Sequence, residues 1–121
     1  MMIKHFTELA IWQNADAFAH GVFDLTDAFP HRYAFDLTNQ LRRAALSVPT
    51  NIVEGRASTH TKELLQFVNI ARRATREAQY LLQFSLRRKL LSAERHEALS
   101  TTSEEIHRML NGLTRSLRRT P

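Results

Sequence analysis

Glycine and proline are rare in this chain, and their scarcity constrains its fold more than any other feature. Each occurs three times in 121 residues. Collagen, a flexible linker rich in these residues and a turn-rich β-sandwich all need many of them, so the composition argues against all three. Hydrophobic residues make up 43% of the chain, which is enough to build a core. We therefore expect one helical domain over residues 1–121.

The spacing of apolar residues predicts four helices, because such residues recur three and four positions apart in four segments. The expected helices cover residues 7–28, residues 33 or 37 to 54, residues 58 or 61 to 91, and residues 92 onward. The connections between them are short, and short connections make consecutive helices antiparallel neighbours. The predicted fold is all-α, an up-and-down antiparallel four-helix bundle.

Four residues mark the expected ends and irregularities of these helices. Pro30 ends the first helix, because the residue before a proline disfavours helical backbone. Pro49 lies inside the second helix and cannot donate a backbone hydrogen bond, so we expect a kink there, or a break with restart. Gly55 is the expected residue just beyond the end of that helix. Hydroxyl side chains are expected to cap the third helix, and Ser92 the fourth.

Several protein classes are excluded by what the sequence lacks. Cysteine is absent, so the chain has no disulfide, thiolate metal site or cysteine nucleophile. No apolar run approaches the roughly 18 to 20 residues needed to cross a bilayer. The first residues lack the apolar segment of a signal peptide, so we expect a cytoplasmic protein. No phosphate-binding loop or nucleophile motif is present, so we expect no enzyme, cofactor or small-molecule substrate.

Positive charge is concentrated in the second half of the chain. The formal net charge is +5. Residues 1–60 carry five basic and six acidic side chains, whereas residues 61–121 carry twelve and six. On the third helix, four arginines and one tyrosine fall within about 100° of one another, opposite the apolar face. These residues are Arg72, Arg73, Arg76, Tyr80 and Arg87.

Two interpretations of this arginine stripe remain open. As a functional surface, it would contact successive phosphates of RNA or DNA, with Tyr80 stacking on an unpaired base. Arg88 extends the stripe, and the fourth helix carries a weaker row of Arg108, Arg115 and Arg119. As an ordinary surface, it would simply be a solvated helix face, which is the commoner role of helical charge runs.

A second polar row lies on the second helix beside its apolar residues. It comprises Gln40, Arg43, Ser47, Asn51 and Glu54. An active site would use Glu54 as a base and Arg43 as an anion clamp. A structural network would instead pair Arg43 with Glu54 and bond Asn51 to backbone freed by Pro49. We favour the structural network, because no nucleophile or metal-ligand set accompanies the row.

The histidines do not form a recognisable metal site. Helical bundles bind metal pairs through a Glu-x-x-His pair on each of two helices. Glu104 and His107 form one such pair, and no other helix carries a second. We therefore expect no metal.

Several sequence blocks, in this order, resemble a bacterial family. They are Trp12-Gln13, Phe29-Pro30, the segment from Leu37 to Ala45, the segment from Ser47 to Gly55, and the segment from Phe67 to Ala71. The chain resembles the four-helix-bundle proteins whose first members were encoded in intervening sequences of 23S ribosomal RNA genes. This resemblance covers nearly the whole chain and implies a four-helix bundle that assembles as a homopentamer.

One departure from the family pattern lies on the third helix. Family members commonly carry a Gly-Ser pair followed by a glutamate, whereas this chain has Arg73-Ala74 and keeps Glu77. We therefore do not carry the close packing of small residues over from the family to this position, and an arginine is added to the stripe. Glu77 joins the expected polar network.

Two functional hypotheses follow from these observations. The first is a non-enzymatic homo-oligomer that binds RNA or DNA without sequence specificity through the arginine stripe. The alternative is a protein-interaction scaffold whose arginines dock an acidic partner protein, with no role in binding nucleic acid.

Overall fold

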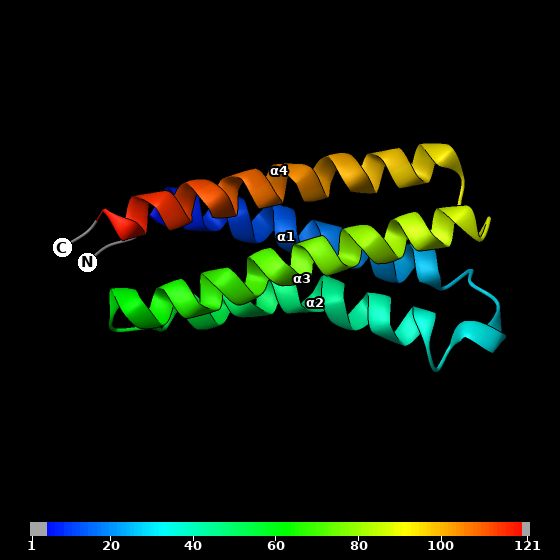
Figure 1. The fold of residues 1–121 in the computed structure, drawn as a ribbon, viewed down its shortest axis with the longest axis horizontal. Coiled ribbons are helices and arrows are strands. Elements are labelled where there is room, and N and C mark those ends of the chain that lie inside the picture. Colours follow the sequence, from blue (N-terminus) through cyan, green and yellow to red (C-terminus); the bar gives the residue numbers. More distant parts are fainter. Residues whose placement is uncertain (1–4, 120–121) are drawn as a thin grey trace.

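The computed structural model describes the backbone of residues 5–119 and the side chains of residues 10–119. Its helices are α1 (His5–Thr26), α2 (Leu37–Arg56), α3 (Thr61–Arg87) and α4 (Ala93–Arg118), with a short 3-10 helix, η1 (His31–Tyr33), between α1 and α2 (Figure 1). No strand occurs in this described part of the chain. The predicted all-α fold is confirmed.

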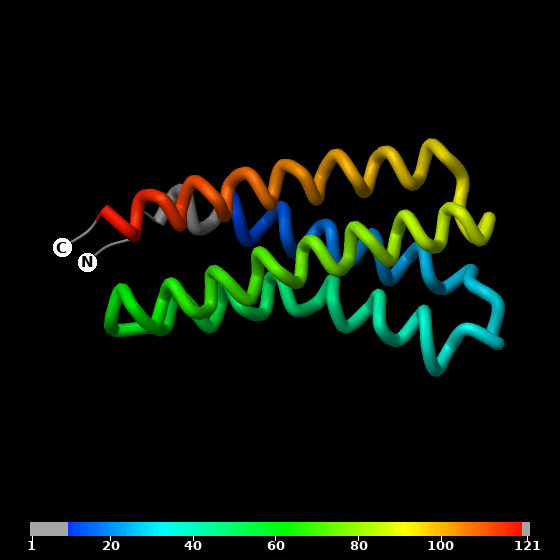
Figure 2. Tube along the Cα trace, viewed as in Figure 1, coloured from blue at the N-terminus to red at the C-terminus, as the bar shows by residue number. Residues whose placement is uncertain are grey.

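The helices are arranged as an up-and-down bundle (Figure 2). Each helix packs against the next one along the chain, and α4 closes the bundle against α1. In the described range, the backbones of the diagonal pairs α1–α3 and α2–α4 do not approach each other closely. The α1–α2 and α3–α4 connectors consequently lie at the same end of the bundle (Figure 1).

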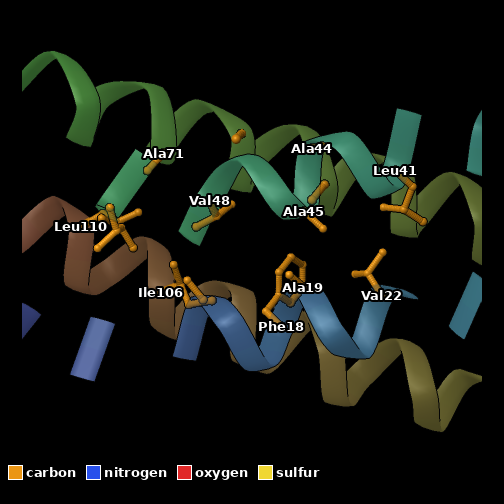
Figure 3. Close-up of a cluster of buried hydrophobic side chains, with 14 of the residues drawn as sticks. Phe18, Ala19, Val22, Leu41, Ala44, Ala45, Val48, Ala71, Ile106 and Leu110 are labelled. Carbon is orange, nitrogen blue, oxygen red and sulfur yellow. The ribbon is translucent and has the colours of Figure 1, made fainter. Parts of the chain in front are cut away.

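The core is a single apolar cluster to which all four helices contribute. Phe18 of α1 points toward Ala45 of α2, and Leu110 of α4 belongs to the same buried cluster (Figure 3). Phe18 and Leu110 are almost completely buried. The buried side chains of α2 and α3 include small alanines, which allow the helices to pack closely. They are Ala44, Ala45, Ala71, Ala74 and Ala78.

The second helix begins at the later of its two expected starts and ends beyond its expected end. It starts at Leu37, where the Asp36 side chain accepts a hydrogen bond from the Leu37 amide, and Tyr33 belongs to η1 instead. At the other end α2 continues through Gly55 to Arg56, so the prediction that Gly55 lies beyond the helix is wrong. A Cβ on Gly55 would lie 2.9 Å from Leu64 Cδ1 of α3. Phe67 Cβ would lie 3.4 Å from the same position, so Gly55 stands where α3 comes close to α2.

Proline in α2 does not interrupt the helix. Pro49 is buried, and helical structure is continuous on both sides of it, so the expected break with restart does not occur. The Asn51 side-chain amide donates to the Ser47 carbonyl at 2.8 Å and to the Ser47 hydroxyl at 3.0 Å. Asn51 thus bonds to backbone near Pro49, but its acceptor is not the Ala45 carbonyl that the proline leaves free.

The connector between α3 and α4 is short and strained. Helix α3 ends at Arg87, before the expected Leu91, and Lys89 has a φ of 63°. The Leu90 amide donates to the Ser85 carbonyl and the Lys89 amide to the Leu86 carbonyl, the pattern of a Schellman turn that glycine usually completes. The predicted cap of α4 is confirmed, because the Ser92 hydroxyl accepts from the Arg95 amide at 3.1 Å.

The N-terminus of α3 lacks the expected hydroxyl cap. His60 occupies the cap position without a side-chain hydrogen bond. The Ser58 hydroxyl is buried without a partner. The prediction of a hydroxyl cap there is therefore wrong.

Candidate nucleic-acid interface

The excess of positive charge lies on α3 and the connector that follows it. Helix α3 carries five basic and two acidic residues, and Arg88 and Lys89 follow directly. Helix α4 carries four of each, so it is electrically balanced. Most of the excess charge of the C-terminal half therefore belongs to α3 and the connector after it, and α4 contributes none of it.

Two arginines of the predicted stripe turn toward α4 and bind polar side chains there. The Arg72 Nε donates to the Asn111 side-chain oxygen at 2.8 Å, and Arg72 is half-buried. The Arg76 guanidinium donates to the Glu104 carboxylate at 2.9 Å and to the Gln79 side-chain oxygen at 2.7 Å. Both arginines therefore hold the α3–α4 seam together, a role that the sequence pattern did not reveal.

The same seam contains the one buried histidine among residues 10–119. The Asn111 side chain lies 3.1 Å from His107 Nδ1. Burial is the main cause that lowers the pKa of His107, and the nearby Arg76 charge lowers it further. The hydrogen bond from Arg76 lowers the pKa of Glu104. Glu104 and His107, the single Glu-x-x-His pair of the sequence, thus contact Arg76 and Asn111 respectively.

The other stripe arginines face water. Arg73 and Arg87 are exposed and bind no other residue in the described part of the chain. Arg73 lines a groove of about 590 Å³ between α2 and α3, together with Arg43 of α2 and Glu77 of α3. The stripe is therefore divided into a pair that stabilises the α3–α4 seam and a group that remains accessible.

Tyr80 lies on the accessible side, in a neighbouring groove near the connector end of the bundle. Its ring centroid is 6.3 Å from that of Phe84, and both rings are exposed. The Arg88 guanidinium lies across this groove, 3.4 Å from the Tyr33 hydroxyl, and this hydrogen bond lowers the pKa of Tyr33. Sequence reasoning missed Tyr33 and Phe84, because neither falls in the arginine stripe, although both lie near arginines in the sequence.

The arginines of α4 form a sparser group. Arg108 pairs with Glu105 on its own helix. Arg115 and Arg119 are exposed near the C-terminal end of α4, and neither binds another described residue.

The polar row of α2 divides into separate local contacts. Gln40 donates to the Glu77 carboxylate of α3 at 3.3 Å, and Ser47 and Asn51 bond to each other. Arg43 and Glu54 are both exposed and lie eleven positions apart on one continuous helix, a separation of about 16 Å. The expected Arg43–Glu54 pair within one chain is therefore wrong.

Comparison with known proteins decides the family. The sequence pattern described as 23S rRNA-intervening sequence protein matches residues 7–112. The chain belongs to this family. The resemblance inferred from the motifs between Trp12 and Ala71 is thereby confirmed.

A solved structure of similar fold comes from Bacteroides thetaiotaomicron, described as a protein of unknown function from the S23 ribosomal protein family. It aligns with a TM-score of 0.83 at 20% sequence identity, covering 90% of this chain and 98% of that one. No curated protein matches the chain. Among the described residues of this intervening-sequence protein, no helix is long and apolar enough to cross a membrane.

Proposed function

We propose that this protein is a non-catalytic, self-associating helical bundle that binds RNA or DNA through the accessible arginines of α3. The observation that carries the proposal is the uneven charge, since α3 and the following connector hold the net positive charge while α4 is balanced. Phosphate contacts by arginine supply affinity without sequence specificity. The proposal places the protein in the cytoplasm.

The binding surface comprises Arg73, Arg87 and Arg88, with Arg72 and Arg76 as supports. Arg73 and Arg87 are exposed without partners in the described chain, so binding phosphate breaks no existing ion pair. Arg76 is already paired with Glu104, and Arg72 with Asn111. Replacing Arg72 or Arg76 would therefore weaken the packing of α4 against α3, so a loss of nucleic-acid binding in such a variant would not identify a phosphate contact.

Self-association is supported by apolar side chains on the outer face of α2. Leu46 is 50% exposed and Val53 is 51% exposed. An assembly would bury these side chains, and several copies of a weak basic surface would bind one polyanion more tightly through effective concentration. The family resemblance implies a pentamer.

Light scattering over a range of protein concentrations tests the assembly. We expect a mass several times that of one chain. Leu46→Gln combined with Val53→Gln should lower this mass. A monomer at every concentration would contradict self-association.

Nucleic-acid binding is tested by fluorescence anisotropy with a labelled ribosomal RNA fragment at about 50 and 200 mM salt. One variant carries Arg73→Gln, Arg87→Gln and Arg88→Gln. The matched control carries Arg115→Gln, Arg118→Gln and Arg119→Gln, the same change of charge at the C-terminal end of α4.

The α3 variant should bind more weakly. The slope of log binding constant against log salt concentration should become less steep by about two units, because each of the three lost phosphate contacts contributes roughly 0.7 to that slope. The α4 control should change much less. Equal losses in both variants would show that only total charge matters. No binding by the original protein at low salt would contradict the proposal and favour docking of an acidic protein, which a pull-down that survives nuclease would detect.

A further inference from the structure

The groove at the connector end of the bundle combines aromatic rings with arginine. It has a volume of about 450 Å³ and lies between α3 and the segment that runs from η1 into the first turn of α2. Tyr80, Phe84 and Arg88 line it from α3 and its C-cap, and Tyr33 lines it from η1. The two connectors bring these residues together because they lie at the same end of the bundle (Figure 1).

Two rings of α3 are open to solvent in this groove. Tyr80 is 63% exposed and Phe84 is 41% exposed, and they lie one helical turn apart. Their planes are tilted by 53°, with centroids 6.3 Å apart, so they do not stack face to face on each other. Neither ring therefore covers the face of the other, and both are exposed to solvent.

Two arginines lie on the Tyr33 side of this groove. Arg88 lies at the groove wall beside the Tyr33 hydroxyl, and the Arg32 guanidinium lies 5.0 Å from the centroid of the Tyr33 ring. Lys89 follows Arg88 directly in the connector and is exposed. Asp36 is the single acidic residue among the described residues that line the groove, and its carboxylate accepts a hydrogen bond from the Leu37 amide.

We propose that this aromatic–basic groove binds single-stranded nucleic acid. Unpaired bases would stack on Tyr80 and Phe84, while the adjoining phosphates contact Arg87, Arg88 and Lys89. Each nucleotide of the chain carries one planar base and one negatively charged phosphate. The bases can stack on the aromatic rings of the groove while the phosphates contact the neighbouring cations. The inference rests on the proposed function and narrows it to unpaired nucleotides, because bases within a duplex are stacked on each other and cannot reach the rings.

The test compares a labelled uridine oligonucleotide of about twelve residues with an RNA duplex of equal length, by anisotropy at low salt. The ring variant carries Tyr80→Leu and Phe84→Leu, which keep apolar bulk and charge. The matched control is Phe35→Leu, since Phe35 is 88% exposed on the neighbouring connector but does not line the groove. Circular dichroism melting checks that each variant is folded.

The ring variant should bind the single strand at least tenfold more weakly, because each lost base–ring stack weakens binding about fivefold or more. Its duplex affinity should stay within about twofold, and Phe35→Leu should leave both affinities unchanged.

Three outcomes would overturn the inference. If the ring variant keeps its affinity for the single strand, the groove is not the site, although the proposed function stands. If the original protein binds neither nucleic acid, the proposed function fails as well. If the ring variant instead has a lower mass in light scattering, the groove is a contact between copies of this chain.

Discussion

Arg72 and Arg73 are consecutive arginines with different roles in the structure, and exchanging each for alanine should separate those roles. The Arg72 Nε donates to the Asn111 side-chain oxygen at 2.8 Å, which ties α3 to α4. Its Nη1 also donates to Asn69 at 3.1 Å, but this bond is exposed to water. Arg73 is exposed and bonds to no other described residue.

The expected losses follow from these contacts. A hydrogen bond from a charged donor contributes about 1.5 to 3 kcal/mol, and the half-buried position of Arg72 favours the lower end, about 1.5 kcal/mol. With an unfolding entropy of about 2.1 cal/mol/K per residue, this loss lowers the melting temperature of a chain of this length by about 6 °C. Arg73→Ala should change stability by less than about 0.5 kcal/mol.

Urea unfolding followed by circular dichroism measures both values, at one fixed protein concentration because assembly affects apparent stability. A double-mutant cycle of Arg72→Ala with Asn111→Ala should show a coupling of about 1 kcal/mol. Equal losses for Arg72→Ala and Arg73→Ala, or an additive cycle, would refute the division of the stripe.

Three further predictions concern stability. Burial lowers the pKa of His107 below its ordinary value of 6.5, so the contribution of His107 to stability is complete above pH 6.5 and is lost as the pH falls through the lowered pKa. The urea midpoint of the original protein should therefore fall on acidification, and His107→Gln should make this fall smaller. Lys89→Gly should raise the free energy of unfolding by about 0.5 to 1 kcal/mol by relieving the positive φ, and a lower midpoint would contradict the strain. Leu110→Ala should cost about 3 kcal/mol or more in the same assay, since Leu110 is completely buried among the four helices.

The number and order of the helices could be predicted because helical periodicity is local. Apolar residues three and four positions apart lie on one face wherever the chain is helical, whatever it packs against. The cap at Ser92 was predictable for the same reason, since its hydrogen bond spans three residues. The local pattern did not predict that α2 continues through Gly55, because the close approach of Leu64 from α3 depends on packing.

The candidate site depended more on tertiary structure. The sequence places Arg72, Arg76 and Arg87 on one side of a helix, but a helical projection does not show where the neighbouring helix lies. The packing of α4 against α3 engages Arg72 with Asn111 and Arg76 with Glu104, residues 39 and 28 positions away. Arg73 and Arg87 stay accessible, because no described residue binds them.

By itself, the sequence determined the family, the all-α fold and the concentration of positive charge in the second half of the chain, since these depend on residue order and local spacing. Only the tertiary structure decided which arginines are structural and which are accessible. It also brought Tyr33 within reach of Arg88, 55 positions later, because the two connectors lie at one end of the bundle. Contacts between residues so far apart in the sequence depend on how the helices pack. The local spacing of apolar residues does not show that packing.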